Sequence, residues 1–456
     1  MIEDTANTID TIAAPATAPG TAAIAVVRVS GPDCAQLAQA IFRASLRPRQ
    51  TSHRAYRDTA GSVVDDVLVT YFAGPQSYTG EDVLEISTHG NPLIAQLVLD
   101  DLFKRGCRAA DAGEFTRRAF LNGRLDLSQA EAVMDLIHAR SARAIAAANQ
   151  QLRGSLGQHL TRLTDELLLG LARVEAYIDF PEEDLPDEDR VIVVDILNSV
   201  LRGTQQLLAT HRYGDLLREG IKTVILGEPN AGKSSLLNAL LGRERALVSD
   251  EPGTTRDYLE ETVMVGPHCL RLIDTAGLNP TPGTVEALGI QKTYERIEEA
   301  DLALLVLDAN HPAPPLSAEV AHRLNPNTTL VVLNKVDLLQ GQPPVAEAPD
   351  ELPALPLSTR TREGLTTLEQ RITEIADRFR PGDAGDQIAI NARHADALRR
   401  ATDCLETALA NLRSSGPTEL LASDLRGVVD AFGEIGGRID NEAMLDRLFA
   451  TFCIGK

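Results

Sequence analysis

The chain has 456 residues, of which 43% are hydrophobic and 24% are charged, a balance typical of a soluble protein with about two to four globular domains. Its net charge of −21 argues against extended contact of this chain alone with a nucleic-acid backbone. Its five cysteines form no CxxC pair, its first residues do not resemble a signal peptide, and its apolar runs are too short to span a membrane. These features argue against a disulfide framework and a zinc ribbon, and we expect a cytoplasmic protein without membrane contact.

The first 120 residues combine strand-like runs with glycine-rich turns. We expect strands at Ala23–Val29, Val63–Phe72 and Asp82–Ser87, and a helix at Pro92–Arg105. Strands and helices are not strictly alternating here, so the pattern predicts an α+β domain.

The segment from 127 to about 180 has a helical period. Its leucines recur at spacings of four and three and predict one apolar stripe, formed by Leu152, Leu156, Leu160, Leu163 and Leu167. Further helices are expected at Val191–Leu208 and, after a linker that begins at Arg380, at Arg393–Leu412 and Leu420–Ala431.

Between these helices, residues 217–380 alternate strands and helices. The predicted strands are Lys222–Leu226, Leu270–Ile273, Leu302–Leu307 and Thr329–Leu333. This alternation predicts a parallel sheet with helical crossovers. Because helices lie on both sides of it in the sequence, we expect an α/β domain inserted into a helical domain.

A phosphate-binding motif follows the first of these strands. Gly227–Ser234 matches GxxxxGK[ST] and leads into a predicted helix at Ser235–Leu241, which is the context that the motif requires. Backbone N–H groups of such a loop can wrap a β-phosphate, Lys233 can reach the β- and γ-phosphates, and Ser234 can ligate Mg²⁺.

Two further segments have the composition of nucleotide-sensing loops. In Asp274-Thr-Ala-Gly277 the carboxylate can hold the Mg²⁺ shell and the N–H of Gly277 can sense the γ-phosphate. Pro252–Asp257 lies between this motif and the P-loop, and its Thr255 can close on Mg²⁺. The alternative for Thr255 is a solvent-exposed loop residue.

Asn334-Lys-Val-Asp337 follows the last predicted strand. A carboxylate at Asp337 can accept hydrogen bonds from both N1–H and the 2-amino group of guanine, a pair that adenine lacks. Lys335 can pack over the base, and Ser358 and Thr359 fit a loop that closes over guanine. The ordered motifs predict a GTPase.

The residue after the Asp274–Gly277 motif is Leu278, where Ras-like enzymes place a glutamine that orients water. We expect Glu286 to orient the water instead, the alternative being an exposed acid at a helix start. Asn230 could help to hold a monovalent cation that supplies positive charge, the alternative being a turn residue.

Several strings lie outside these motifs: Asp10–Gly20, Tyr78–Asp82, His89-Gly90, Gly113–Leu127, Gln129–Ala132 and Phe452–Lys456. Together with the GTPase motifs, they resemble the MnmE (TrmE) family of tRNA uridine-modification GTPases over essentially the whole chain. The resemblance implies an N-terminal folate-binding and dimerisation domain at 1–122, a helical domain at 123–216 and 381–456, and an inserted Ras-like P-loop GTPase domain at 217–380.

It also implies a potassium-activated enzyme that hydrolyses GTP to GDP and phosphate. With a FAD-dependent partner, MnmG or GidA, such a homodimer forms a heterotetramer that makes the 5-carboxymethylaminomethyl or aminomethyl group of the wobble uridine (position 34) of tRNAs. The one-carbon donor is a 5-formyl or 5,10-methylene tetrahydrofolate, the FAD belongs to the partner, and tRNA is held mainly through the partner. The alternative is a GTP-controlled binding switch in RNP or ribosome assembly.

The resemblance assigns roles residue by residue. Potassium would be held by Asn230, Ser249, Glu251 and Thr254. The motifs themselves already assign Mg²⁺ to Ser234 and Thr255. The catalytic residues would be Glu286, Lys233 and Thr255. The folate-contacting positions would be Arg28, Glu85, Arg124 and Lys456.

Motifs and resemblance together predict the GTP contacts, which are Asn230, Ala231, Gly232, Lys233, Ser234, Ser235, Ser249, Asp250, Glu251, Pro252, Gly253, Thr254, Thr255, Asp274, Thr275, Ala276, Gly277, Asn334, Lys335, Asp337, Ser358 and Thr359. Cys453 matches the cysteine of the family's C-terminal motif, either as a functional thiol or as a buried structural one. The chain departs from the family pattern at Asn91, Asn279 and Thr359.

Overall fold

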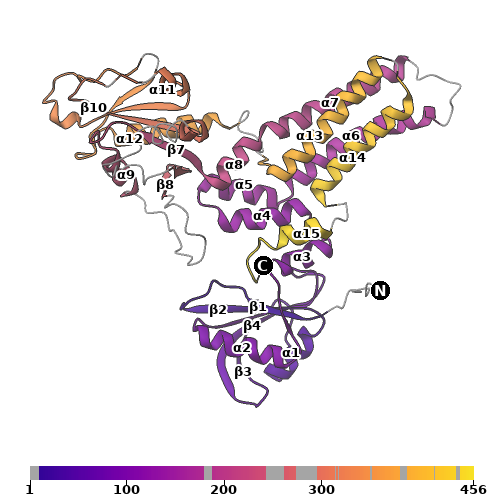
Figure 1. Cartoon of the computed structure of the whole chain (residues 1–456). Coiled ribbons are helices and arrows are strands. Elements are labelled where there is room, and N and C mark those ends of the chain that lie inside the picture. The colour runs from indigo at the N-terminus through magenta and orange to yellow at the C-terminus, as the bar shows by residue number, and fades with distance from the viewer. Residues whose placement is uncertain are drawn as a thin grey trace. The chain divides into compact units, whose positions relative to one another are not determined.

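The computed structural model describes most of the chain (Figure 1). The described residues are 10–178, 187–242, 261–273, 295–313, 315–316, 318–349, 352–380, 388–414, 416–437 and 442–455. The chain divides into two compact units, one formed by Met1–Met134 with Gly433–Lys456 and the other by Asp135–Phe432. Among the helices that the structure describes, none is both long enough and apolar enough to cross a lipid bilayer.

The first unit contains a six-stranded sheet with the order β3-β4-β5-β2-β1-β6. Its strands are β1 (Ile12–Pro15), β2 (Ile24–Ser30), β3 (Ser52–Arg57), β4 (Val63–Phe72), β5 (Val83–His89) and β6 (Arg108–Ala109). All neighbouring strands are antiparallel except β1 and β6. Helices α1 (Cys34–Phe42) and α2 (Pro92–Lys104) share one apolar core with the sheet. The α+β prediction is therefore confirmed.

The start of α2 explains why one departure from the family pattern is tolerated. Asn91 has an extended backbone (φ −95°), and its side chain accepts a hydrogen bond from Leu93 N at 2.9 Å, while Pro92 occupies the first helical turn. This is a regular N-cap, for which asparagine is among the preferred residues. No glycine is required at position 91.

The described part of this unit contains further helices outside the core of the sheet. They are α3 (Glu114–Leu121), the first part of α4 (Leu127–His138) and α15 (Glu442–Phe449). Leu127 and Ala130 of α4 bury their side chains against Leu445, Phe449 and Phe452. This cluster joins the carboxyl-terminal segment to the N-terminal part of the chain.

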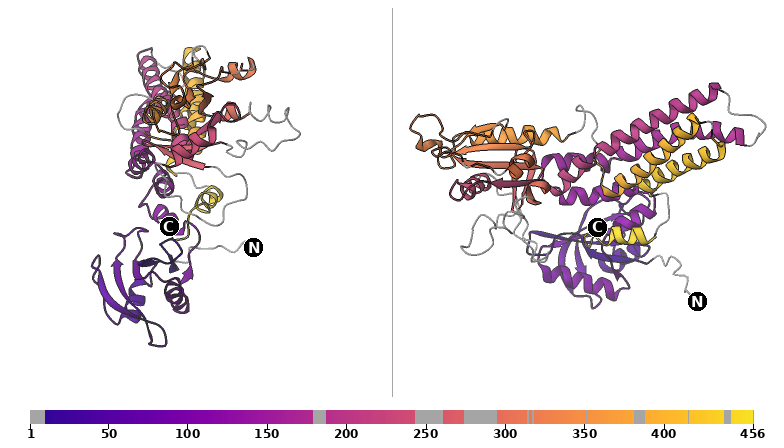
Figure 2. Two further views of the ribbon diagram at one scale, coloured as in Figure 1. Left: turned by 90° about the vertical axis from the view of Figure 1, so that its left-hand side faces the viewer. Right: turned by 45° about the horizontal axis from the view of Figure 1, so that its top comes forward.

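The second unit contains a long bundle of helices that run alongside one another (Figures 1 and 2). They are α6 (Ser155–Ile178), α7 (Asp187–Ala209), α13 (Ala392–Arg413) and α14 (Thr418–Gly436), with the shorter α5 (Ala142–Leu152) and α8 (His211–Glu219) in the same unit. The predicted leucine stripe is buried on α6, but Leu152 ends α5 and is not part of it. That part of the prediction was wrong because Gly154, at φ +85°, breaks the helix.

The same unit contains a second six-stranded sheet, with the order β12-β11-β10-β7-β9-β8. Its strands are β7 (Ile221–Leu226), β8 (Glu261–Val265), β9 (His268–Leu272), β10 (Leu302–Asp308), β11 (Thr329–Asn334) and β12 (Ala354–Pro356). Its neighbouring strands are parallel, as predicted, except for the β8–β9 hairpin at one edge.

Both faces of this sheet are covered by apolar clusters. Leu304 and Val306 of β10 point into the cluster that contains α9 (Lys233–Leu241) and α12 (Leu365–Arg378). Leu305 and Leu307 point into the opposite cluster, which includes Leu324 after α11 (Ala318–Arg323). Burial on both faces explains why the strand is a continuous apolar run. Because β7, β10 and β11 are parallel neighbours, their carboxyl ends lie at the same edge of the sheet.

Candidate functional site

The loop after β7 has the backbone geometry of a phosphate-binding loop. Gly227 has φ +141°, and a Cβ there would collide with the carbonyl oxygen of Val306, so only glycine fits. Gly232 has φ +101° at the N-cap of α9, and a Cβ there would collide with the side-chain amide of Asn334. The two glycines let the loop pass close to β10 and β11 before α9 begins.

Lys233 is the first residue of α9, and its side chain folds back over the loop. Its Nζ donates hydrogen bonds to the carbonyl oxygens of Gly227 at 2.8 Å and Glu228 at 2.7 Å. Burial lowers the pKa of Lys233, and the nearby Glu228 carboxylate opposes this shift. Two carbonyl oxygens thus hold the ammonium group inside the curve of the loop.

The other predicted P-loop contacts occupy the same turn. Asn230 is exposed and has a left-handed backbone (φ +66°), Ala231 is buried, and Ser234 and Ser235 are exposed in the first turn of α9. The Ser234 hydroxyl lies at the N-terminus of α9, where the helix dipole favours the binding of anionic groups such as phosphate.

Asn334, at the end of β11, joins two loops through its fully buried side chain. Its Nδ2 donates to the carbonyl oxygen of Ala231 at 3.0 Å, and its Oδ1 accepts from Thr359 N at 3.2 Å. The P-loop and the Ser358–Thr359 loop are therefore fixed to the same amide. The structure brings these sequence-predicted residues together.

Asp337 lies in the short 3₁₀ helix Val336–Leu338. The hydroxyl of Ser358, itself buried, donates to Asp337 Oδ1 at 2.7 Å, and Thr361 N donates to Ser358 Oγ at 3.1 Å. The hydrogen bond from Ser358 restricts the rotation of the Asp337 carboxylate, so its direction is fixed. Lys335, beside it, has φ +65°.

Sequence reasoning missed two residues of this edge. Lys335 Nζ forms an ion pair of 2.8 Å with Asp308, and Asn310 Nδ2 donates to the backbone oxygen of Lys335 at 3.2 Å. A signal was available for Asp308, because it directly follows the predicted strand Leu302–Leu307 and ligand-binding residues collect at the carboxyl ends of parallel strands.

Part of the predicted site lies outside the described residues. These positions are Ser249, Asp250, Glu251, Pro252, Gly253, Thr254, Thr255, Asp274, Thr275, Ala276, Gly277, Glu286 and Lys456, and with them Leu278 and Asn279. Within the described part of the chain, no three His, Cys, Asp or Glu side chains are grouped to hold a metal ion. Mg²⁺ held by a hydroxyl, phosphate oxygens and water needs no such group, and Ser234 fits that coordination.

A second candidate site surrounds Arg28 in the N-terminal unit. Its guanidinium donates to Glu85 Oε1 through Nε at 3.0 Å and Nη2 at 2.8 Å, and to the carbonyl oxygen of Gly455 at 3.2 Å. It also lies over the rings of Tyr78 and Phe115, at 5.4 and 5.8 Å from their centroids. Of the folate-contacting residues predicted from the resemblance, Arg28 and Glu85 are in direct contact.

The other predicted residues of this unit are more peripheral. Arg124 is exposed in the loop after α3, and its side chain packs beside Gly80. Cys453 is exposed, so the alternative of a buried structural thiol was wrong. Its carbonyl oxygen accepts from Gly113 N at 3.4 Å, because the chain end pairs with the segment before α3.

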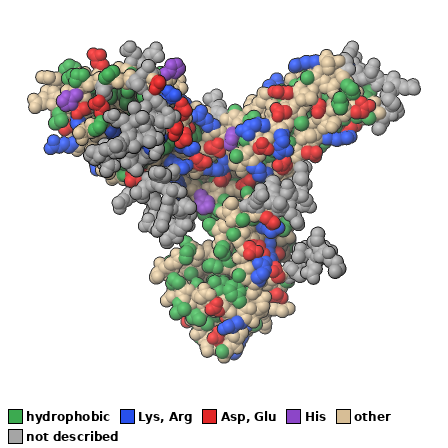
Figure 3. Space-filling model, viewed as in Figure 1, with side chains coloured by type: hydrophobic (Ala, Val, Ile, Leu, Met, Phe, Trp, Pro, Cys, Tyr) green, Lys and Arg blue, Asp and Glu red, His purple; other side chains and the backbone are tan. Residues whose placement is uncertain are grey.

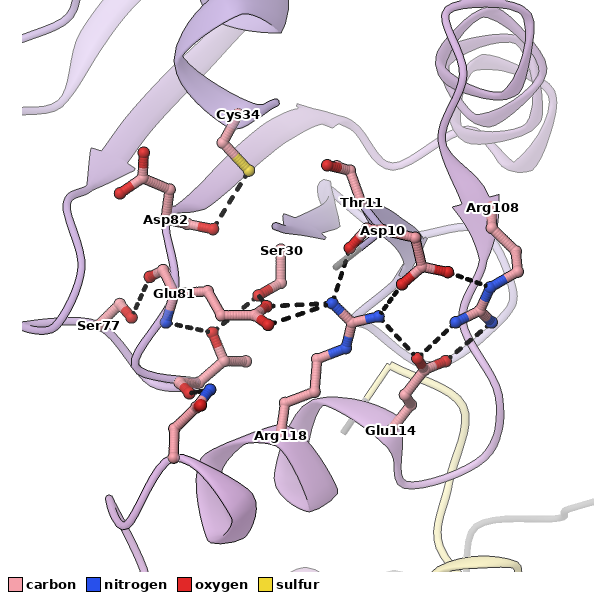
Figure 4. A network of polar contacts seen from close by, with 12 residues as sticks. Asp10, Thr11, Ser30, Cys34, Ser77, Glu81, Asp82, Arg108, Glu114 and Arg118 are labelled. Atoms are coloured by element: carbon pink, nitrogen blue, oxygen red, sulfur yellow. Dashed lines mark hydrogen bonds and ion pairs between the residues drawn. The ribbon is translucent and has the colours of Figure 1, made fainter. Parts of the chain in front are cut away.

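A polar network in the N-terminal unit contains residues from the segments Tyr78–Asp82 and Gly113–Leu127 (Figure 4). Arg118 donates to Asp10 Oδ1 at 2.5 Å and Glu114 Oε1 at 2.9 Å, and it pairs with Glu81 at 3.1 Å. Arg108 donates to the same Asp10 and Glu114 carboxylates at 2.7 and 2.6 Å. Burial alone raises the pKa of Glu114, but the hydrogen bonds from both arginines lower it below its ordinary value. The network thus connects the chain at Asp10, the loop at Glu81 and the segment from Arg108 to Arg118.

The surface carries charges of both signs. On the face shown in Figure 3, the basic and acidic side chains of the described residues are interspersed, and no continuous basic surface is visible there. This face offers no extended electrostatic footprint for a nucleic acid.

The largely parallel sheet, the glycine-dependent P-loop and the Asn334–Asp337 segment define a P-loop GTPase domain. Two family models match the chain, one described as MnmE helical domain at residues 127–453 and one described as GTP-binding protein TrmE N-terminus at residues 11–124. The chain belongs to the MnmE family of tRNA modification GTPases.

Curated relatives agree over the full length. The tRNA modification GTPase MnmE of Opitutus terrae is 56% identical over 447 residues, which cover 98% of this chain and 99% of the relative. The MnmE of Akkermansia muciniphila is 44% identical over 457 aligned positions, with coverage of 98% and 99%. Among solved structures, the G domain of the T. maritima FeoB iron transporter is 26% identical and matches 34% of this chain and 98% of its own, with a TM-score of 0.24, which is too low to support a fold argument.

Proposed function

We propose that the chain binds GTP with Mg²⁺, hydrolyses it to GDP and phosphate, and does so in the modification of tRNA. The observation that carries this proposal is the bridge made by the buried Asn334 side chain between the P-loop at Ala231 and the loop at Thr359. One amide thereby couples a phosphate-binding loop to a base-binding loop. Family membership supports the tRNA part of the proposal.

In the proposed nucleotide complex, Lys233 exchanges its two carbonyl partners for phosphate oxygens. The exchange is favourable because an ammonium group bonded to neutral carbonyl oxygens gains a charge-assisted partner. Ser234 and Thr255 would hold Mg²⁺, which when bound neutralises phosphate charge. Asp337 would accept two hydrogen bonds from guanine, and its fixed orientation supports this role. The full set of GTP contacts is proposed as predicted from the sequence.

For hydrolysis we propose that Glu286 orients the attacking water, since Leu278 has no polar group. Potassium would be held by Asn230, Ser249, Glu251 and Thr254. The left-handed, exposed position of Asn230 supports its part in this site. Equal GTPase rates in K⁺ and Na⁺ at matched ionic strength would contradict the potassium assignment.

We further propose that residues 1–122 bind a tetrahydrofolate derivative, 5-formyl or 5,10-methylene, through Arg28, Glu85, Arg124 and Lys456. The contact of Arg28 with Glu85 and the Gly455 carbonyl supports the first two assignments. The pteridine ring and the glutamate tail of a folate offer donors and carboxylates that this pair can bind. Loss of 5-formyltetrahydrofolate binding in Arg28→Ala would agree with the proposal.

The remaining proposals concern organisation and partners. We propose a helical domain at 123–216 and 381–456 and an inserted GTPase domain at 217–380. The chain would act in the cytoplasm as a homodimer and form a heterotetramer with the FAD-containing MnmG (GidA), which would supply most tRNA contacts. Cys453 is exposed and remains a candidate functional thiol. The product would be the aminomethyl or carboxymethylaminomethyl wobble uridine.

The deciding experiment compares guanine, xanthine and adenine nucleotides on the full chain. Wild type should prefer GDP to ADP, and Asp337→Asn should shift preference toward xanthosine diphosphate, because the new amide matches the reversed hydrogen-bonding group of that ring. No preference for guanine in wild type would overturn the GTPase proposal. Nucleoside analysis of tRNA after deletion of the gene tests the modification. Unaltered tRNA with defective ribosome assembly would favour a binding switch instead.

A further inference from the structure

Lys335 is held from two directions, by Asp308 at the end of strand β10 and by Asn310 in the turn that follows it. Asp308 is the last residue of β10, and in the parallel register of β10 and β11 it lies opposite Asn334. Asn334 directly precedes Lys335 in the sequence. Asp308 Oδ2 pairs with Lys335 Nζ at 2.8 Å, and Asn310 Nδ2 donates to the Lys335 carbonyl oxygen at 3.2 Å. Side chain and backbone of one lysine are thus fixed by two residues of another segment.

The acidic partner is itself fixed. Asp308 Oδ1 accepts hydrogen bonds from both the backbone N and the side-chain Nδ2 of Asn310, each at 3.0 Å. Burial alone raises the pKa of Asp308, but the hydrogen bonds from Lys335 and Asn310 lower it below its ordinary value. The carboxylate therefore stays charged at neutral pH, and each of its oxygens has a defined partner.

The backbone of Lys335 explains why two supports are needed. Its φ of +65° lies in the left-handed region, which a residue with a long side chain rarely adopts without help from its surroundings. The hydrogen bond from Asn310 holds this conformation at the carbonyl group. The ion pair with Asp308 then fixes the direction of the flexible side chain.

We propose that Asp308 and Asn310 are positioning residues for the guanine base, which hold Lys335 so that its aliphatic stem forms one wall of the base site. This inference rests on the proposed GTP-binding function. A lysine that is already ordered loses less rotamer freedom when the base arrives, so binding is stronger and release is slower. Asp308 touches the lysine and not the base, and it therefore affects affinity without reading the ring substituents.

The test measures dissociation of N-methylanthraniloyl-GDP from the full chain by stopped flow. Asp308→Asn removes the charge with little change of shape, and Asn310→Ala removes the backbone support. We expect each to accelerate release by roughly 10-fold, which is the lower end of the range for loss of a hydrogen bond to a charged group. Lys335→Ala should accelerate release at least as much, and Asp308→Asn should add little in the Lys335→Ala background.

A second readout separates positioning from general damage. The ratio of GDP to IDP affinity reports recognition of the 2-amino group by Asp337, so it should be unchanged in Asp308→Asn and altered in Asp337→Asn. Asn325→Ala is the matched control, because Asn325 makes a comparable turn contact, accepting from Asn327 N at 2.9 Å, on the exposed surface. It should leave release unchanged.

The proposal is overturned if Asp308→Asn releases the nucleotide at the wild-type rate, if its effect adds fully to that of Lys335→Ala, or if the GDP to IDP ratio changes. Should Asp308→Asn fail to fold, the same cycle with Asn310→Ala decides the question. A wild-type protein with no preference for GDP over ADP would instead refute the underlying GTPase function.

Discussion

The Ser358 hydroxyl and the Asp337 carboxylate form a hydrogen bond of 2.7 Å, in which the serine donates and is completely buried. The bond restricts rotation of the carboxylate, while Thr361 N fixes the serine oxygen from the other side. The residue proposed to select guanine is therefore orientated by a loop that is more than twenty positions further along the chain.

Ser358→Ala should weaken guanine nucleotide binding. Removing one neutral-to-charged hydrogen bond costs about 1.5–3 kcal/mol, which corresponds to roughly 10- to 100-fold in GDP affinity. Isothermal titration with GDP measures this change. Thr361→Ala is the matched control, because Thr361 contacts Ser358 through its backbone N–H, and the variant should bind as wild type does.

Gly227→Ala should abolish nucleotide binding or destabilise the second unit. The new methyl group meets the Val306 carbonyl oxygen, and the backbone is at φ +141°. Gly341→Ala separates the two causes, since Gly341 also has a positive φ (+85°) but no atom lies within 4 Å of the added carbon. We expect a cost of about 1–2 kcal/mol for the control by thermal unfolding and unchanged GDP binding. Equal losses in both variants would mean that the collision is unimportant.

The network around Arg118 predicts acid sensitivity of the N-terminal unit. The pKa values of Asp10 and Glu114 are lowered in the folded state because, although burial raises them, hydrogen bonds from Arg108 and Arg118 prevail. The unfolded chain then binds protons more readily, so this stabilisation is complete above about pH 4.5 and is lost as the pH falls through the folded-state values.

Arg118→Met should therefore lower the unfolding temperature at pH 7 and flatten its dependence on pH between 5 and 3, as measured by scanning calorimetry. Arg117→Met is the control on the same helix, since its pair with Asp446 at 3.0 Å lies at the surface and is worth at most about 1 kcal/mol. Parallel pH curves for wild type and Arg118→Met would contradict the expectation.

Cys453 should be the fastest thiol to react with a disulfide reagent. It is exposed, whereas Cys34, Cys107 and Cys269 are buried and Cys404 is half-buried. Burial raises the pKa of the Cys107 thiol to about 11 and also raises that of Cys404, which reduces the reactive thiolate. Cys453→Ser should remove the fast phase of labelling in the native protein, and Cys404→Ser should retain it.

Glu286→Ala should retain GTP affinity and lose turnover by about 100-fold or more, the usual contribution of a positioned acid or base. Single-turnover hydrolysis in K⁺ measures the rate, and titration with a non-hydrolysable analogue measures affinity. Turnover at the wild-type rate would show that another group orients the water.

The elements predicted best from the sequence are the strands whose two faces are both buried, because burial requires an apolar residue at nearly every position. β10 and β11 are buried on both faces, so their continuous apolar runs could be recognised. β1 has only four residues and β6 has two, too few for a period to be visible, and their pairing depends on segments about a hundred positions apart. The break at Gly154 was missed because the leucine spacing continues across it.

The candidate site shows the same division. Gly227, Lys233, Asn334 and Asp337 lie in motifs whose spacing reveals them. Asp308 follows a predicted strand, which marks it as a possible site residue, but no local pattern pairs Asp308 or Asn310 with Lys335 on the next strand. Likewise, Tyr78 and Phe115 stack on Arg28 only because the fold gathers them. Contacts of this kind arise from tertiary structure and are invisible to local periodicity.

The hydrogen bond from Arg28 to the Gly455 carbonyl oxygen joins positions that are 427 residues apart. During synthesis, a ribosome has to deliver both intervening domains before this contact can form, while strands β2 and β5 around Arg28 are complete much earlier. Strands β2 and β5 must therefore hold Arg28 and Glu85 in place before Gly455 has been synthesised. We expect an extension fused after residue 456 to disturb the contacts of Arg28 more than an insertion in an exposed loop.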